Sequence, residues 1–424
     1  MFDIAGQPST SAQRGAIKQL AHWPQGRAAS LNVALIGNAL PRLCGIATFT
    51  TDLRQALAQS PRVGKASIVA MTDRGRTYAY PPFVERSIAE EDLRSYEAAA
   101  RFLNSGPIDV VSLQHEFGIY GGADGDNILD LIDELRRPLV TTMHTILASP
   151  SRHQRHVIER IARDSARVVV MAAKGARLLA ENYDVDAGKI TVIDHGIPDV
   201  PMVPADVMKE KRGFAGRKVI LTFGLLSPNK GIEVMIDAMP AVLETCPDAL
   251  YIVLGATHPH LVRNDGEAYR ESLLARAEHL GISNNVLFIN QFVERAELLE
   301  YIAMCDVYVT PYLSEAQMTS GTLAYSFGLG RPIVSTPYWH ATELLSDGRG
   351  ELVPFGDSEA TGKAITGLLN DPARCAAISQ RNYAEGRSMI WSCVGEKYVD
   401  VLAAAVQREA GTIDGRPAAV RTVA

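Results

Sequence analysis

Residues 31–58 read LNVALIGNALPRLCGIATFTTDLRQALA. The apolar run Leu31–Gly37 ends in a glycine, a loop that contains Gly45 follows, and Thr48–Ala58 carries apolar residues at helical spacing. This order is typical of a buried strand, a loop and a covering helix. Because that unit builds parallel sheets, the stretch predicts an α/β protein.

The same unit recurs in two series. The first series has further apolar, β-branched runs at Ser67–Thr72, Asp109–Leu113, Pro138–Met143, Arg167–Met171 and Ile190–Ile193. After the proline-containing stretch Val200–Val207, the second series has runs at Lys218–Phe223, Leu250–Leu254, Val286–Ile289, Val307–Thr310 and Pro332–Ser335. Helical patterns separate the runs, so each series predicts a parallel sheet covered on both faces. We predict two doubly wound domains with ligands at the carboxyl ends of their strands.

The chain has 424 residues, which exceeds one ordinary core. We place the first domain over 31–208 and the second over 212–384. A helix over 385–408 has apolar residues on one face and is expected to brace the first domain. The flanking stretches 1–30, with a short helix near Ala16–His22, and 409–424 are predicted to be tails.

The composition excludes several classes of protein. Apolar residues make up 47% and charged residues 21%, which is typical of a folded chain, and the net charge of −6 argues against a nucleic-acid partner. The five cysteines are scattered without a C-x-x-C pair, which argues against a zinc site or a disulfide framework. With neither a signal pattern nor an apolar run of about 18–20 residues, the sequence predicts a cytoplasmic protein.

The basic stretch over residues 152–167 leaves open whether the protein contacts a membrane surface. Five arginines and two histidines lie within residues 152–167, and this face would suit weak contact with anionic lipid at the inner face of a membrane. Glu159 and Asp164 interrupt it, which also fits a solvated helix.

Two loops of the second domain have features of a phosphate site. Leu221–Gly231 ends a strand at Gly224 and places Lys230 just before a helix, where a cation and free backbone N–H groups would meet. Thr310–Pro332 places Ser320, Gly321 and Thr322 at the start of the next such helix. Each loop alone also fits an ordinary turn or helix cap. Together they favour a nucleoside diphosphate.

The loops of the first domain are less specific. Gly45 permits close backbone approach, but its loop lacks the G-x-G-x-x-G fingerprint, which disfavours a dinucleotide cofactor. His144 ends a predicted strand, where an imidazole could contact a sugar hydroxyl or play a structural part. His115 and Glu116 end the preceding strand, and the glycines of the loop after them suggest a mobile lid on the acceptor side. No metal-ligand spacing is present, so we expect neither a metal nor a cofactor.

The chain resembles the group 1 glycosyltransferases of family 4, which have the GT-B fold of two facing Rossmann-like domains. The resemblance covers about Leu31 to Leu402. It depends on seven pieces in order: the Gly45 loop, TTMHT (141–145), VIDHGIPD (192–199), FGLLSPNKG (223–231), VLFINQFV (286–293), VYVTPYLSEA (307–316) and GLGRPIVST (328–336).

The resemblance implies a retaining, metal-independent transfer of a hexose from a nucleoside-diphosphate sugar to a carbohydrate or lipid-linked acceptor. GDP-mannose and UDP-hexoses are both open as donors, and the oligomeric state is not indicated. Lys230 and His144 would serve catalysis, the latter by contacting the transferred sugar. The remaining implied contacts are Gly45, Gly224, Ser320, Gly321 and Thr322 for the diphosphate, Phe292, Val293 and Tyr325 for the nucleoside, and His115, Glu116, Arg263 and Gln317 for donor or acceptor.

Three positions depart from the family's pattern. Leu225 stands where the family usually has an arginine, and Gln317 and Tyr325 stand at the two glutamates of its E-x7-E motif. We hypothesise that Arg263 or Arg270 replaces the arginine. The departures keep two alternatives open: a silent nucleotide-sugar-binding protein and a sugar-nucleotide 2-epimerase.

Overall fold

A computed structural model describes residues 30–414 of the chain. The predicted tail over 1–29, with its helix near Ala16–His22, and the last part of the predicted C-terminal tail lie outside the described residues.

The first domain is built on a parallel sheet of seven strands. Their spatial order is β3-β2-β1-β4-β5-β6-β7, so strands are added on one side of β1 up to β3 and on its other side from β4 onward, with all strands parallel. The strands are β1 Leu31–Gly37, β2 Val63–Thr72, β3 Val84–Ala89, β4 Val110–His115, β5 Leu139–Met143, β6 Arg167–Val170 and β7 Ile190–Val192. The helices are α1 Gly45–Gln59, α2 Leu93–Ser105, α3 Ile128–Glu134, α4 Arg152–Asp164 and α5 Ala173–Asn182.

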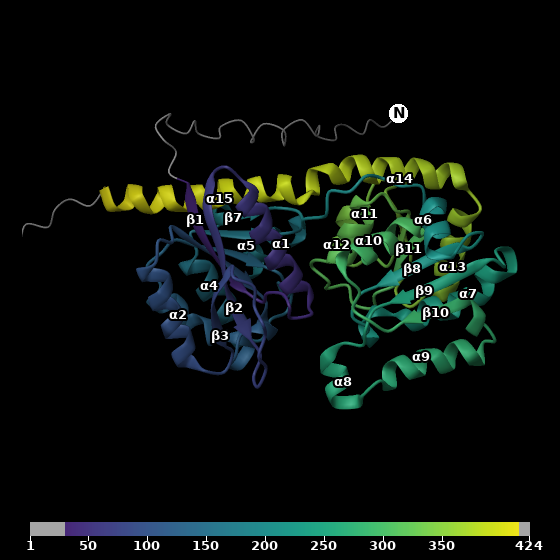
Figure 1. Cartoon of the computed structure of the whole chain (residues 1–424), viewed down its shortest axis with the longest axis horizontal. Coiled ribbons are helices and arrows are strands. Elements are labelled where there is room, and N and C mark those ends of the chain that lie inside the picture. Colours follow the sequence, from purple (N-terminus) through teal and green to yellow (C-terminus); the bar gives the residue numbers. More distant parts are fainter. Residues whose placement is uncertain (1–29, 415–424) are drawn as a thin grey trace, which may run out of the picture.

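The second domain repeats this topology with six parallel strands in the order β10-β9-β8-β11-β12-β13. The strands are β8 Lys218–Phe223, β9 Ala249–Leu254, β10 Val286–Ile289, β11 Val307–Thr310, β12 Ile333–Ser335 and β13 Glu351–Leu352. Its helices are α6 Ala205–Arg212, α7 Ile232–Thr245, α8 Pro259–Asp265, α9 Ala268–His279, α10 Arg295–Met304, α11 Gly321–Gly328, α12 Trp339–Leu344, α13 Ser358–Leu369 and α14 Pro372–Gly386. Figure 1 shows the two domains side by side, and this arrangement confirms the predicted fold class.

Each predicted strand is present, but β3 and β13 were not predicted. β3 reads VERSIA and lies at the sheet edge, where its side chains are alternately exposed. It therefore lacks the continuous apolar run by which the other strands were predicted. β13 has only two residues. The stretch predicted as a linker, Val200–Val207, is irregular up to Pro204, and α6 begins within it at Ala205.

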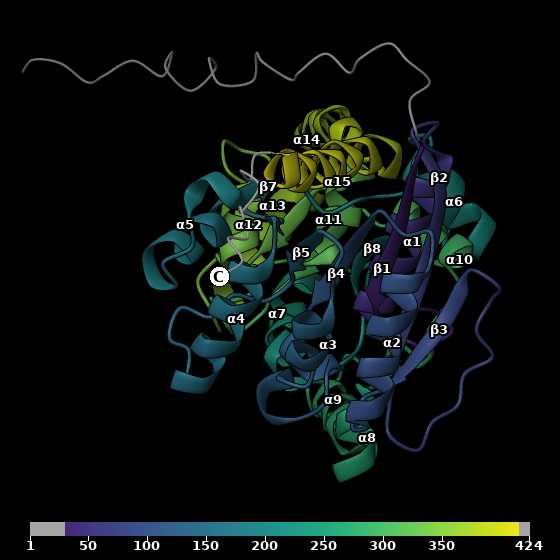
Figure 2. The same ribbon diagram turned by 90° about the vertical axis from the view of Figure 1, so that its left-hand side faces the viewer.

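The last helix, α15 Trp391–Asp414, leaves the second domain and runs along the first. Val394, Tyr398 and Leu402 are fully buried in the core that β1 and α1 share. The hydroxyl of Tyr398 lies 3.1 Å from that of Thr142 on β5. In both views α14 and α15 follow one edge of the molecule, whereas α8 and α9 lie at the opposite edge (Figure 2). Among the described residues no helix has the length and apolar content that crossing a membrane requires.

Candidate active site between the two domains

The start of α11 offers backbone donors at the carboxyl edge of the second sheet. Helix first-turn N–H groups have no intrahelical acceptor, which leaves the amides of Gly321 and Thr322 available to a ligand. The Ser320 hydroxyl caps the helix by accepting from the amide of Leu323 at 3.2 Å. The Ser320 amide donates to Nδ1 of His340 at 2.9 Å. The prediction that all three amides hold a phosphate is therefore wrong for Ser320, whose N–H is already bonded inside the protein.

Lys230 points toward this helix start. Its Nζ lies 3.9 Å from the centroid of the Tyr312 ring, a distance at which a cation–π attraction operates. The Tyr312 hydroxyl lies 3.1 Å from that of Thr322 at the start of α11. The two loops that the sequence singled out thus meet, with Tyr312 between the ammonium group and the helix.

Glycine allows the strand ends to approach α11. Gly224 has φ +124°, and a Cβ on it would lie 3.4 Å from Cγ2 of Thr322. Gly255 has φ +151°, and a Cβ there would lie 1.9 Å from the carbonyl oxygen of Gly224. A side chain at Gly255 would therefore collide with backbone, so the close approach of the residues after β8 and β9 requires glycine there.

The first domain contributes Gly45 and His144. Gly45 begins α1 and is exposed, and a Cβ on it would meet no described atom within 4 Å. Nε2 of His144 donates to Oε1 of Gln114 at 3.1 Å, and the ring packs edge-on against Phe49. Burial, together with the nearby His195 and His115, lowers the pKa of His144 to about 3, so the imidazole is neutral at pH 7.

His115 and Glu116 lie beside His144 at the end of β4. His115 is fully buried, and neither of its ring nitrogens has a partner among the described residues. Burial lowers its pKa to about 3. The Glu116 carboxylate accepts from the hydroxyl of Thr145 and from the amide of Phe117, and burial raises its pKa.

The loop after Glu116 is packed and does not form the predicted mobile lid. The amide of Gly121 donates to the hydroxyl of Tyr96 at 3.2 Å, and the Tyr120 hydroxyl donates to the carbonyl of Gln114 at 2.8 Å. A Cβ on Gly121 would lie 1.9 Å from the carbonyl oxygen of Glu90. The glycine therefore permits a close contact and does not confer mobility.

We expect Gly121→Ala to lower the free energy of unfolding by about 2–3 kcal/mol, since the new methyl group overlaps backbone that cannot move aside. Urea unfolding measures the effect. Gly118→Ala is the matched control, because a Cβ on Gly118 would have no described neighbour within 4 Å. Equal stability of the two variants would restore the lid interpretation.

Tyr325, predicted to contact the nucleoside, is used differently. It is buried, and its hydroxyl donates to Oδ2 of Asp52 on α1 at 3.2 Å. Arg295 Nη2 donates to the other oxygen of the same carboxylate. The hydroxyl proton of Tyr325 is donated to Asp52. In place of the predicted ribose contact, Tyr325 makes a contact between the two domains.

The other predicted residues are exposed or make local contacts within the second domain. Phe292 is 43% exposed in the loop after β10, while Val293 packs on the core of the second domain. The Gln317 amide donates to the carbonyl of Thr319 at 2.6 Å. Of the two candidate replacement arginines, Arg263 is exposed on α8, and Arg270 donates to Glu267 at 3.1 Å, so its charge is neutralised locally.

His195 is a site residue that the sequence did not single out, although it lies inside VIDHGIPD. Its Nδ1 donates to the carbonyl of Gly196 at 2.8 Å, which leaves the lone pair on Nε2. A Cβ on Gly321 would lie 2.9 Å from that Nε2. The imidazole of the first domain therefore contacts the helix start of the second, and burial lowers its pKa to about 4.

The basic helix face is charge-balanced. Arg155 pairs with Glu159, while Arg160 and Arg163 pair with Asp164. Arg160 also pairs with Asp133. These contacts favour the solvated-helix interpretation over a lipid-binding face.

Two family models match successive parts of the chain. The model described as Glycosyltransferase Family 4 matches residues 44–199, and the model described as Glycosyl transferases group 1 matches residues 205–385. The chain belongs to the group 1 glycosyltransferases of family 4. The two matches meet between the two sheets described above.

Similar curated proteins are glycosyltransferases as well. A GDP-mannose-dependent alpha-(1-6)-phosphatidylinositol monomannoside mannosyltransferase from Mycolicibacterium smegmatis is 29% identical over 180 residues, or 40% of this chain and 44% of the relative. The lipopolysaccharide core biosynthesis mannosyltransferase LpsB of Rhizobium meliloti is 28% identical over 202 residues, or 46% and 54%. The chain thus spans about half the length of these curated relatives.

Solved structures share the fold. HepE of Anabaena in complex with UDP superposes with a TM-score of 0.70 at 18% identity, over 88% of this glycosyltransferase and 100% of HepE. The sucrose-phosphate synthase of Thermosynechococcus elongatus gives 0.71 at 16% identity, over 91% and 100%.

Proposed function

We propose that this glycosyltransferase transfers a hexose from a nucleoside-diphosphate sugar to a hydroxyl group of a carbohydrate or glycolipid, with retention of configuration. GDP-mannose is favoured as donor by the names of the mannosyltransferase relatives, and a UDP-sugar is the alternative suggested by HepE, whose structures contain UDP and UDP-glucose.

One observation carries the proposal. The Lys230 ammonium group lies over the Tyr312 ring, and the Tyr312 hydroxyl lies 3.1 Å from that of Thr322, in the first turn of α11. A pyrophosphate fits such a site, because a point charge and oriented N–H groups both stabilise negative oxygen.

The proposed reaction proceeds on one face of the sugar. The acceptor oxygen bonds to the anomeric carbon from the side on which the diphosphate leaves, and the carbon–oxygen bond to the diphosphate breaks. The acceptor's proton moves to the leaving phosphate oxygen. Lys230 and the amides of Gly321 and Thr322 stabilise the charge that grows on the diphosphate, and neutral His144 hydrogen-bonds the transferred sugar.

Because fixed protein groups supply the stabilising charge, we expect turnover without a divalent cation. Addition of EDTA to the assayed enzyme should change the rate of nucleotide release by less than about twofold, whereas losing one essential electrostatic contact costs about 10²–10³ in rate. A loss on that larger scale, reversed by Mg²⁺ or Mn²⁺, would contradict metal-independent transfer.

Binding of the nucleotide is tested by thermal unfolding with UDP, GDP, ADP and their sugars. A ligand in hundredfold excess over its dissociation constant stabilises the native state by about 2.7 kcal/mol, so one base should raise the melting temperature above the others. Lys230→Met should remove most of that rise, and the exposed Lys363→Met should not. If none of the nucleotides raised it, the proposed site would be wrong.

The departures at Leu225, Gln317 and Tyr325 favour a second candidate, a protein that binds a nucleotide sugar without turning it over. Donor turnover separates the two candidates. Release of an epimerised donor without an acceptor would identify the 2-epimerase alternative.

A further inference from the structure

Asp52 is a buried carboxylate that joins the two domains. It lies seven residues after Gly45 on α1, and its side chain is only 1% exposed. Its two oxygens accept from Arg295 and from the Tyr325 hydroxyl, both of the second domain. Burial raises the pKa of Asp52 and the Arg295 charge opposes that shift.

The partners of Asp52 link two parts of the proposed donor site. Arg295 is the first residue of α10 and is separated only by Glu294 from Phe292 and Val293, where the family resemblance places the nucleobase. Tyr325 belongs to α11, whose first-turn residue Thr322 is linked to Lys230 through Tyr312. Asp52 therefore ties the helix that begins with Gly45 to both segments.

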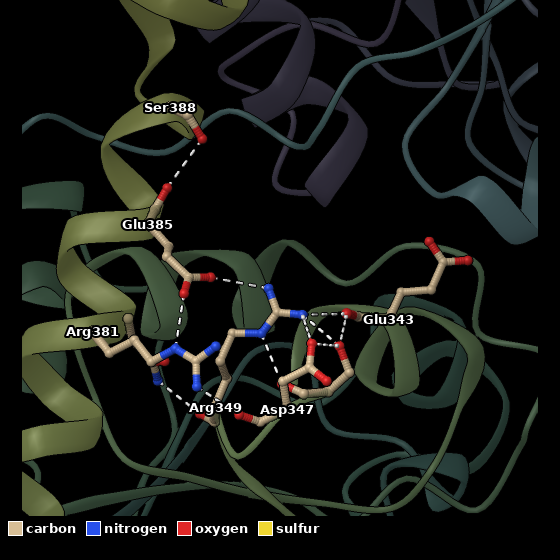
Figure 3. A network of polar contacts seen from close by, with 8 residues as sticks. Glu343, Asp347, Arg349, Arg381, Glu385 and Ser388 are labelled. Carbon is tan, nitrogen blue, oxygen red and sulfur yellow. Dashed lines mark hydrogen bonds and ion pairs between the residues drawn. The ribbon is translucent and has the colours of Figure 1, made fainter. Parts of the chain in front are cut away.

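A second carboxylate, that of Glu343, extends from the second domain to the first. Glu343 on α12 accepts from the amides of Ala173 and Lys174 at 2.8 and 2.5 Å, and so caps the start of α5 in the first domain. Figure 3 shows its carboxylate pointing away from the surrounding polar network. In that network Arg349 donates to the Glu343 carbonyl at 3.2 Å and pairs with Glu385 at 3.1 Å, which fixes the end of α12.

The Glu343 contact and the Asp52–Arg295 ion pair differ in how their loss would affect the contact between the two domains. Loss of the Glu343 carboxylate leaves amide groups that water can reach at the rim, since α5 begins with half-buried and exposed residues. Loss of Arg295 leaves a buried carboxylate with the Tyr325 hydroxyl, also of the second domain, as its remaining hydrogen-bond donor. Domain separation would hydrate this unpaired charge, so it would favour an open molecule.

We propose that Asp52 and Arg295 are positioning residues for the transfer reaction: their ion pair holds the start of α1, with Gly45, against the domain that carries Lys230. The inference rests on the proposed function for its kinetic consequence, but its structural consequence is independent of any substrate.

The test compares Arg295→Met, Asp52→Asn and the double variant. Arg295→Met should lower kcat/KM for the donor about 100-fold, because it leaves the buried charge unpaired. The double variant should recover to within about fivefold of the wild type, since asparagine removes the charge and still accepts from Tyr325. Small-angle X-ray scattering of the unliganded proteins should show a larger radius of gyration for Arg295→Met alone.

Arg276→Met is the matched control, because Arg276 pairs with Asp237 inside the second domain. It should match the wild type in both measurements. Equal impairment of the single and double variants, or a wild-type radius for Arg295→Met, would overturn the positioning role. Absence of turnover by the wild type would refute the proposed function and leave the scattering comparison to decide the inference.

Discussion

Lys230→Met is expected to lower kcat by about 10²–10³ while the protein stays folded. The ammonium group packs on the Tyr312 ring, whose hydroxyl lies 3.1 Å from that of Thr322 in α11, and charge would grow on a diphosphate bound beside it. Its stabilisation is larger in the transition state than in the ground state, so kcat should fall more than KM rises. Steady-state assays of nucleotide release over a range of donor concentrations up to saturation measure both constants.

The control for this prediction is Lys363→Met, which removes an exposed lysine from α13 of the same domain. It should leave kcat unchanged. A Lys230→Met enzyme with kcat near that of the wild type would show that the ammonium group does not act on the diphosphate.

Acid should destabilise the protein steeply below pH 6.5. Burial lowers the pKa of His115, His144 and His340 to about 3 and that of His195 to about 4. Each lowered pKa means that the unfolded chain binds the proton more tightly, so stability is complete above about pH 6.5 and is lost as the pH falls toward 4. Each fully buried histidine removes about 1.4 kcal/mol per pH unit in that window, and half-buried His195 removes less.

Urea unfolding at pH 7.0 and 5.0 measures this dependence. We expect a loss of about 4–6 kcal/mol between the two values. His115→Leu should reduce this fall in the free energy of unfolding by about the contribution of one histidine. The substitution should not disturb the fold by breaking a hydrogen bond, because neither nitrogen of His115 bonds a described group. An unchanged pH slope in that variant would contradict the neutral, buried state of His115.

Continuous apolar strands were enough to predict the fold. Runs such as Leu31–Gly37 and Lys218–Phe223 are buried on both faces, so their composition alone marks them. The edge strand β3 is half exposed and carries no such mark. Loops at strand ends predicted where Lys230 and the start of α11 would lie, because parallel strands present their carboxyl ends at one edge.

Contacts between distant segments could not be predicted in this way. Asp52 reads as one polar residue on an amphipathic helix, and only the docking of α10 and α11 encloses it. Tyr325 stands where the family has a glutamate, and nothing local reveals that its hydroxyl bonds Asp52. The glycines at 121 and 122 suggested mobility because sequence alone does not show the backbone that surrounds them.

The most direct test of the proposed transfer is nucleotide release by the wild-type protein from GDP-mannose and UDP-hexoses, with and without a sugar or glycolipid acceptor. One donor should be consumed, an acceptor should accelerate its consumption, and the product should keep the donor's anomeric configuration. A protein that binds the nucleotide yet consumes none of these donors would contradict the proposed transfer.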